Sequence, residues 1–428
     1  MALGRTVRRF FPSLRRCLDA LGDFRDPRLV IYPARSLLWS GVLLFLFRLG
    51  ARRRLRFELH SPAGVENLNR IAETNIEQIP HPDTLAYYLK GVCPEELSDV
   101  RTGMVRDLVR SRALDRDRLL GRYYTIAIDG TGHLAFDAPH CPHCLTQELA
   151  NGRTRYYHPV LEAKLVCENG LSLSVATEFI QNTDGANKQD CELAAFYRLL
   201  PKLRKQFPML RICLLLDGEY LNQNVMRLAK TLRLHWIMTF KEGSLPTAYA
   251  EFHALHALTT GQTLAHQHED RSQHHRWLNG LRHEDQTFNA FECVETNARG
   301  DTTTFLWATD LPVKRSNVVE LSQRGGRCRW KIENQGFNTQ KNQGYNLEHA
   351  YCRDPVAAKN FYLLLQIAHI LSQLIEKGNL LGAAVVKLYG SSRAFAQRLL
   401  EAFRNIPIRA EVWADLIARR FQIRLDTS

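Results

Sequence analysis

The chain has few cysteines, no long hydrophobic run, no internal repeat and no low-complexity segment. Its 428 residues contain ten irregularly spaced cysteines, of which only Cys141 and Cys144 form a CxxC pair. This usage excludes a disulfide-dense scaffold and favours a reducing compartment, the cytoplasm. The longest apolar run, residues 37–47, is far shorter than the roughly 20 residues that a membrane-spanning helix needs. We therefore expect a buried helix at this position and no membrane partner.

Acidic residues are scarce relative to basic ones. Lysine and arginine number 57 against 44 aspartates and glutamates, which gives a formal net charge of +13. Such an excess indicates a polyanionic partner, and nucleic acid is the commonest one. The alternative is a basic enzyme that binds no nucleic acid. Hydrophobic residues make up 45% of the chain, which excludes a disordered or collagen-like protein, and the length suggests several globular domains.

Residues 1–118 are predicted to form a helical domain. Apolar residues recur at three- and four-residue spacing in 100–119, and Pro82 with Asp83 marks a further helix start. The end of this region is dense in arginine, at Arg101, Arg106, Arg110, Arg112, Arg116 and Arg118. The pattern favours a DNA-binding region, and the alternative is a solvated helix face with acidic partners.

After residue 118 the pattern changes to that of a sheet. Residues 123–129 are rich in β-branched and aromatic side chains, and 160–168 and 171–178 flank an Asn-Gly turn typical of a hairpin. Predicted helices over 190–206 and 222–231 separate two further strands, 211–217 and 235–240. A hairpin followed by crossover units predicts an α/β fold with a mixed sheet and flanking helices.

The remainder of the chain divides into three predicted parts after a first core segment, 119–240. Residues 241–310 form a β-rich insertion that contains seven of the sixteen histidines without a ligand motif. Residues 311–378 return to the core with helical signals, including Asp354-Pro355 at a helix start. Residues 379–428 are expected to form a helical tail.

Three carboxylates fall at positions suited to phosphodiester chemistry. Asp129 ends the first predicted strand, Asp217 ends the fourth, and Glu333 lies in a later helix. The two strands are expected to be neighbours, so both aspartates would reach one cleft. Carboxylates bind hard divalent cations such as Mg²⁺, with Mn²⁺ as the alternative ion, and these activate water or a 3′-hydroxyl for phosphoryl transfer. Taken singly, each strand-ending aspartate is more often a turn residue.

The blocks "IAIDGTG" (126–132), "LLLDGEY" (214–220) and "RWKIEN" (329–334) resemble the signatures of IS4-like DDE transposases, which are insertion-sequence enzymes. The resemblance covers residues 120–375. It implies an RNase H-like fold, a long β insertion between the second aspartate and the glutamate, and Asp129, Asp217 and Glu333 as the catalytic, Mg²⁺-binding triad. Their separations of 88 and 116 residues leave room for that insertion.

The same resemblance suggests residues that contact DNA. Arg329 matches the basic residue four positions before the glutamate in the family's Tyr-Arg-Glu-Lys pattern, and it would grip a phosphate; the alternative is an ion pair with Glu333. The pattern departs at Gly326, where the family has tyrosine, and at Gln340, where it has lysine. Lys341, one position later, is the candidate DNA-contacting lysine.

The sequence also suggests roles for three aromatic side chains and one further acid. Trp277 of the insertion is the candidate for stacking on a flipped base, with core packing as the alternative. Glu178 ends the third strand and either approaches the cleft or serves as a capping or ion-pairing acid. Trp330 and Phe337 are expected to pack the helix of Glu333 against the core.

A second metal site is predicted between the first two strands. Cys141 and Cys144 have the spacing of half a zinc site, and His140 and His158 are the expected remaining ligands. Further candidate ligands are His133, His143 and Cys167. The alternative is a reduced loop that binds no metal.

Together these patterns predict a DNA transposase that cleaves double-stranded DNA at transposon ends and transfers the strand into target DNA. We expect a homodimer in the DNA complex and a cytoplasmic, nucleoid-associated protein of a prokaryote. The alternatives are a stand-alone RNase H-like nuclease, a domesticated DNA-binding protein that no longer cuts, and a metal-dependent phosphohydrolase of small substrates. Terminal inverted repeats flanking the gene would separate the transposase from the nuclease and the non-cutting protein.

Overall fold

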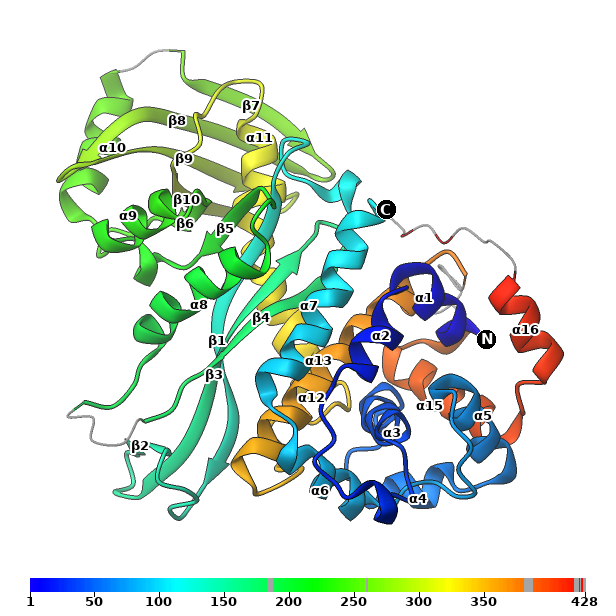
Figure 1. The fold of residues 1–428 in the computed structure, drawn as a ribbon. Coiled ribbons are helices and arrows are strands. Elements are labelled where there is room, and N and C mark those ends of the chain that lie inside the picture. The colour runs from blue at the N-terminus through cyan, green and yellow to red at the C-terminus, as the bar shows by residue number, and fades with distance from the viewer. Residues whose placement is uncertain (183–187, 259–260, 381–387, 419–422, 424, 426–428) are drawn as a thin grey trace.

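The computed structural model describes the chain except for residues 183–187, 259–260, 381–387, 419–422, 424 and 426–428 (Figure 1). In this described part, ten strands form one sheet. The strands are β1 (Tyr124–Phe136), β2 (Leu145–Glu148), β3 (Thr154–Val166), β4 (Ser172–Phe179), β5 (Ile212–Leu216), β6 (His235–Thr239), β7 (Thr263–His268), β8 (Arg271–His283), β9 (Gln286–Thr296) and β10 (Thr302–Thr309).

Five strands form the centre of the sheet in the spatial order β4-β3-β1-β5-β6. β1, β3 and β4 are antiparallel neighbours, whereas β1, β5 and β6 run parallel. The β3–β4 turn contains Gly170 at a φ of +82°, a conformation that glycine adopts without strain. The predicted mixed sheet is therefore confirmed, and the protein is an α/β protein with helices packed on the sheet.

The predicted insertion does not form a separate sheet. β10 pairs antiparallel with β6, and β9, β8 and β7 follow it outward, so the central sheet continues into the insertion. A helix that the sequence analysis did not predict, α10 (Pro246–Leu258), packs against β8. β2, β7 and β8 were likewise not predicted.

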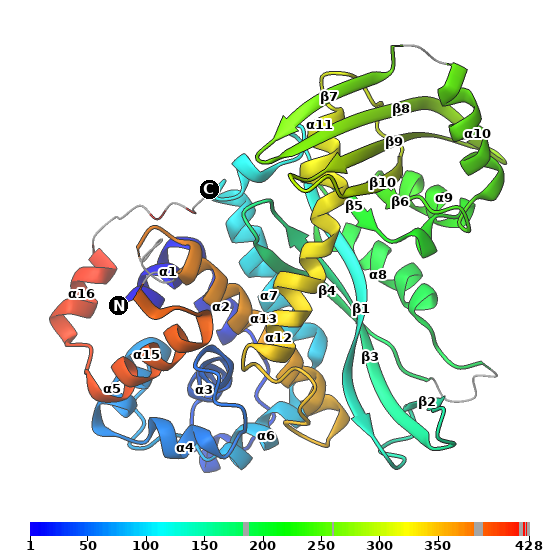
Figure 2. The ribbon, with the colours of Figure 1, turned by 180° about the vertical axis from the view of Figure 1, so that it is seen from behind.

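Three helical segments flank the sheet and connect its parts. α8 (Glu192–Gln206) and α9 (Gln223–Thr231) are the two crossovers that the sequence predicts. The stretch from 318 to 342 runs along β1 in Figure 2 and mixes helix types. It comprises α11 (Val318–Glu320), η4 (Leu321–Gly325), η5 (Gly326–Trp330), η6 (Ile332–Phe337) and α12 (Asn338–Asn342). η4 and η6 are π-helical, a form that is frequent at functional sites.

The N-terminal helices and the C-terminal helices form one helical region (Figure 1). The long helix α13 (Pro355–Lys377) packs against α3, α6 and α7, and α15 packs against α4 and α5. The C-terminal segment is thus part of this region and not a separate tail. The other bounds are α1 (Ala2–Phe10), α2 (Leu14–Asp19), α3 (Ala34–Leu46), α4 (Arg54–Leu59), α5 (Pro62–Ala72), α6 (Pro82–Gly91), α7 (Pro94–Arg110), α15 (Ser392–Asn405) and α16 (Ala410–Ala418), with short 3₁₀ turns η1 (Pro27–Leu29), η2 (Asp115–Asp117) and η3 (Gly218–Tyr220).

The apolar run at 37–47 is buried within α3 and the residue that follows it, as expected. Among the described residues, no helix combines the length and the apolar character that crossing a membrane requires.

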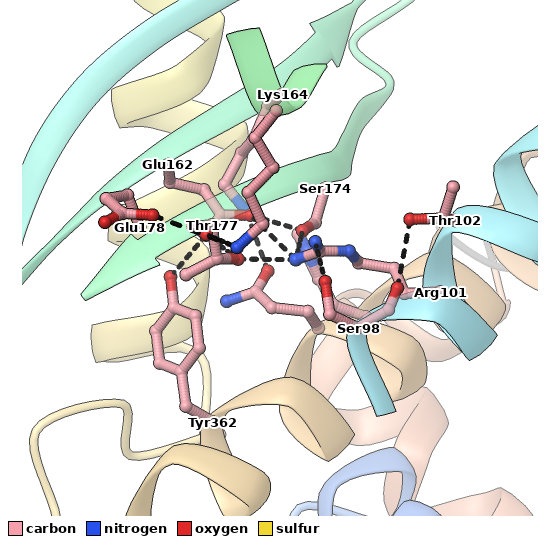
Figure 3. A network of polar contacts seen from close by, with 12 residues as sticks. Ser98, Arg101, Thr102, Glu162, Lys164, Ser174, Thr177, Glu178 and Tyr362 are labelled. Carbon is pink, nitrogen blue, oxygen red and sulfur yellow. Dashed lines mark hydrogen bonds and ion pairs between the residues drawn. The ribbon is translucent and has the colours of Figure 1, made fainter. Parts of the chain in front are cut away.

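A buried polar network joins the helical region to the sheet (Figure 3). Arg101 of α7 and Glu162 of β3 are both fully buried and lie 3.8 Å apart. The Glu162 carboxylate accepts hydrogen bonds from Ser174, from Thr177 (2.7 Å) and from the Tyr362 hydroxyl of α13 (2.9 Å). Because Arg101 is enclosed in this way, it is not available to DNA, and the inclusion of Arg101 among the DNA-contacting arginines was wrong.

Removal of one member of this buried pair is expected to destabilise the fold strongly. Glu162→Ala leaves Arg101 charged and unpaired, which should lower the free energy of unfolding by about 3–5 kcal/mol. Glu178→Ala is the matched control, because Glu178 lies on neighbouring β4 and forms its ion pairs with the more exposed Arg198 and Lys202. Its loss should cost no more than about 1 kcal/mol in urea unfolding. Equal losses for the two variants would contradict the role of the network.

Candidate active site

Asp129 and Asp217 lie side by side because their strands are parallel and in register. Ala127 of β1 pairs with Leu215 of β5, and each aspartate lies two residues farther along its own strand direction. Asp217 directly follows β5 and caps the 3₁₀ turn after it, where its Oδ1 accepts a hydrogen bond from the Gly218 amide (2.7 Å). The prediction that Asp129 ends its strand was wrong, because antiparallel pairing with β3 extends β1 to Phe136. The predicted convergence of the two aspartates is thus a direct consequence of strand register.

Glu333 reaches the same place from the π-helical segment η6, which contacts β1. Arg329, one helical turn earlier, lies between the carboxylates. Its Nη1 is 3.4 Å from Glu333 Oε1 and 3.7 Å from Asp129 Oδ2. The Arg329 side chain is only 6% exposed, whereas that of Glu333 is 40% exposed. The structure therefore brings the three predicted acids near one buried guanidinium, whose charge also acts on Asp217. Arg329 forms an ion pair with Glu333, the alternative to the predicted phosphate contact.

The electrostatics of the two aspartates differ. Burial, together with contact with the Glu333 carboxyl, raises the pKa of Asp129 to about 7, although the Arg329 charge opposes this shift. Burial also acts to raise the pKa of Asp217, but the Gly218 amide and the charges of Arg329 and Lys241 outweigh it and hold that pKa below its ordinary value. Lys241 Nζ lies 3.3 Å from Asp217 Oδ1. One carboxyl is thus crowded by negative charge and the other is well compensated.

A fourth carboxylate, Glu192, was missed by the sequence analysis. It lies at the start of α8, accepts a hydrogen bond from the Tyr220 hydroxyl (2.6 Å) and contributes to the raised pKa of Asp129. A Cβ at position 130 would overlap the Glu192 carboxylate, so a larger residue beside Asp129 would displace that side chain. This glycine in the first block was the one signal in the sequence, but it does not identify its neighbour.

The helix of Glu333 also explains the two departures from the family pattern. A Cβ at Gly326 would overlap the Trp307 indole of β10, so this chain has no space for tyrosine there. Gln340 is fully buried and bonded to Gln366, whereas Lys341 is partly exposed and pairs with Glu348 at 2.9 Å. The one-residue offset therefore leaves the lysine near the surface and the glutamine in the core.

The burial of two tryptophans is the reverse of what the sequence analysis expects. Trp277 of β8 is only 5% exposed and belongs to the core, so the stacking role expected of Trp277 is wrong and the core-packing alternative holds. Trp330, expected to pack inward, is 49% exposed, and its ring lies 4.3 Å from the Arg329 guanidinium carbon. Phe337 is buried, as expected. Glu178 is bound to Arg198 (2.7 Å), in agreement with its ion-pairing alternative.

The predicted zinc ligands converge in part. The cluster that could hold a metal in the described residues comprises Cys141, Cys144 and His158. His140 does not join it, because its Nε2 lies 2.6 Å from the Arg353 carbonyl oxygen. Of the further candidates, His143 contacts the Asn182 carbonyl (2.9 Å), Cys167 follows the opposite end of β3 from His158, and His133 is buried outside the cluster.

Comparison with known proteins adds no family to this geometry. Neither a scan against protein-family models nor a search of curated proteins found a match to this chain.

The contact between Gly130 and Glu192 can be tested by stability alone. Gly130→Ala forces the Glu192 carboxylate away from Tyr220, and the lost hydrogen bond to a charged acceptor should lower the free energy of unfolding by about 1.5–3 kcal/mol. In a Tyr220→Phe background that bond is already absent, so the added cost of Gly130→Ala should fall by most of this amount. Gly243→Ala, with open space around its Cβ, is the control. An identical cost in both backgrounds would show that Tyr220 does not hold Glu192.

Proposed function

We propose that the chain is a DDE transposase with an RNase H-like catalytic core, and that Asp129, Asp217 and Glu333 are its catalytic residues. The observation that carries the proposal is the convergence of these three acids, which are far apart in the sequence, around Arg329. A cluster of partly exposed carboxylates is the arrangement that metal-dependent phosphoryl transfer requires.

The topology supports the same proposal. The order β4-β3-β1-β5-β6, with an antiparallel half followed by parallel crossovers, agrees with the order of elements that the resemblance implies. The strands β7–β10 lie between Asp217 and Glu333 in the chain, as a β insertion would. The functional inference, however, rests on the site, because a fold alone hosts many functions.

The donor chemistry of the acids suits a hard divalent cation, although their oxygens do not form one of the compact ligand groups of the described residues. Asp129, Asp217 and Glu333 offer oxygen ligands only, and their side chains are 23%, 31% and 40% exposed. Burial first, and then the neighbouring carboxyls of Glu333 and Glu192, raise the pKa of Asp129, and a bound cation would favour its charged form. These three residues would hold Mg²⁺, or Mn²⁺ as the alternative ion. When bound, the ion polarises the phosphate and lowers the pKa of water.

The residues of the chain then have distinct tasks. Arg329, held between two of the carboxylates, keeps them together and offsets part of their repulsion. The exposed Trp330 beside Arg329, and the partly exposed Lys341 later in the same helical stretch, are the proposed contacts to the DNA end. Water attacks phosphorus, and the P–O3′ bond breaks to leave a free 3′-hydroxyl. That hydroxyl then attacks a phosphodiester of the target, and the P–O3′ bond of the target strand breaks and releases its 3′-hydroxyl. Positioning and electrostatics suffice for this in-line displacement.

The net charge of +13 suits a double-stranded DNA partner, both transposon end and target. Two ends must be held together for joining, and we propose that a homodimer does so. The same function places the protein on the nucleoid of a prokaryotic cell.

A plasmid excision assay with the DNA that flanks the gene tests the proposal. Asp129→Asn, Asp217→Asn and Glu333→Gln should each reduce cutting at the ends by at least about a hundredfold, because each removes several kcal/mol of metal-held charge stabilisation. Chelation should abolish cutting while duplex binding persists. Glu178→Gln is the control, since this acid is bound to Arg198 away from the triad, and it should cut normally.

The other outcomes are equally informative. Cutting without strand joining would assign a nuclease, and binding without cutting by the wild type would assign a domesticated DNA-binding protein. Cutting that survives Glu333→Gln would refute the third carboxylate.

Trp330 should contribute to binding of the cleaved end. Trp330→Ala is expected to weaken binding of a nicked or frayed end by about 1–3 kcal/mol, roughly 5- to 150-fold, because an exposed indole stacks on an unpaired base. Trp330→Phe should retain most of the affinity in a fluorescence-anisotropy titration at fixed salt. An intact duplex without an unpaired base should bind both variants nearly as well as the wild type. Equal loss for duplex and frayed end would argue against stacking.

A further inference from the structure

Cys141, Cys144 and His158 meet at the tip of the ribbon formed by β1, β2 and β3. The two cysteines precede β2 in the excursion between β1 and β3, and His158 lies on β3. The two sulfurs are 3.7 Å apart, and each is 3.3 Å from His158 Nε2. Both cysteines are free, and the sulfur separation is far longer than the roughly 2.05 Å of a disulfide bond.

These separations are those of ligands around a tetrahedral ion. Zinc bonds of about 2.3 Å to sulfur and 2.0–2.1 Å to nitrogen place two sulfurs about 3.8 Å apart and a sulfur and a nitrogen about 3.5 Å apart. The three measured distances agree with this geometry within a few tenths of an ångström. Thiolate and imidazole ligands also select zinc over the hard Mg²⁺ proposed for the carboxylates.

We propose that Cys141, Cys144 and His158 bind one Zn²⁺ ion, with a water molecule in the fourth position. Among the described histidines nearby, His140 and His143 are turned to the backbone oxygens of Arg353 and Asn182 and do not complete the set. The site borders a small cavity lined in part by Pro159, Phe179 and Ala358, which offers space for a fourth ligand.

The contacts around the cysteines indicate what the ion would stabilise. Asn182 donates its backbone N–H to the His143 carbonyl (3.1 Å) and its side-chain amide to the Cys144 carbonyl (2.8 Å). The Asn182 side-chain oxygen accepts from the Asp190 amide at 3.1 Å. Asp190 lies two residues before Glu192. The residues that flank the metal ligands therefore hold, through Asn182, the segment around Asp190 that leads into α8.

Strand β2 adds a second anchor to the same segment. Thr146, two residues after Cys144, accepts from the Gln189 side-chain amide (3.1 Å), and its own amide donates to the Gln189 side-chain oxygen (2.7 Å). Gln189, Asp190 and Glu192 are nearly consecutive. A fixed cysteine pair would thus help to hold Glu192 beside Asp129, although neither residue is a ligand of the ion.

Metal content tests the proposal directly. The wild-type chain, equilibrated with equimolar ZnCl₂ under a non-chelating reductant and then gel-filtered, should retain about one zinc per molecule by mass spectrometry. Cys141→Ser, Cys144→Ser and His158→Ala should each lose most of it. Cys93→Ser, which alters an exposed cysteine outside the cluster, and His140→Ala should retain it. Loss of zinc in His140→Ala would overturn the assigned ligand set.

Two readouts do not depend on the variants folding. Replacement of zinc by Co²⁺ in the wild type should produce thiolate-to-metal charge-transfer absorption, and a chelator should lower its melting temperature. Cys144→Ser should melt lower than the wild type and be insensitive to the chelator. Wild-type protein that retains no zinc, or that shows no thiolate absorption with Co²⁺, would refute the site. None of these measurements requires DNA cleavage, so the zinc proposal and the transposase proposal can fail separately.

Discussion

Repulsion between carboxylates gathered beside the middle of β1 is the constraint that the surrounding structure must satisfy. Asp129 contacts Glu333, lies near Glu192 and has its pKa raised to about 7 by burial and by these neighbours. Arg329 offsets part of the repulsion from within 4 Å of two of the acids. Groups that repel one another stay together only when their backbone is held elsewhere. Strand register holds the aspartates, and the packed π-helical segment holds Glu333.

The support for β1 comes from the opposite neighbour in the sheet. Glu162 is the register partner of Asp129 on β3, and it is fully buried with Arg101 and Tyr362. This network ties β3 to helices from both ends of the chain, α7 and α13. A buried charge that loses its partner is costly, so the network favours a single arrangement of its side chains. This arrangement holds β3 in place, and β3 in turn pairs with β1. The acids are thus positioned beside a buried frame in which the Glu162 carboxylate accepts three hydrogen bonds.

Several parts of this arrangement follow from local sequence patterns. The Asn-Gly turn, the strand that leads into Asp217 and the helix at Asp354-Pro355 were all predicted, because turn geometry, β-branched runs and capping residues act over a few neighbours. The end of the first strand was not, since β1 continues beyond Asp129 to Phe136. The continuous sheet through β10 and β6 was not predicted, since pairing partners 70 residues apart leave no local pattern. Glu192 was missed for the same reason, because the glycine at position 130 does not show which distant side chain lies beside it.

The α/β class, the strand that leads into Asp217 and the short spacing of Cys141 and Cys144 follow from the order of residues alone. Which side chains are buried and which meet depends on the tertiary structure. It placed Trp277 in the core and Trp330 at the surface, turned His140 to the Arg353 carbonyl, and enclosed Arg101. The physical reason is that period and turn chemistry are properties of neighbouring residues, whereas exposure and convergence depend on how distant elements pack.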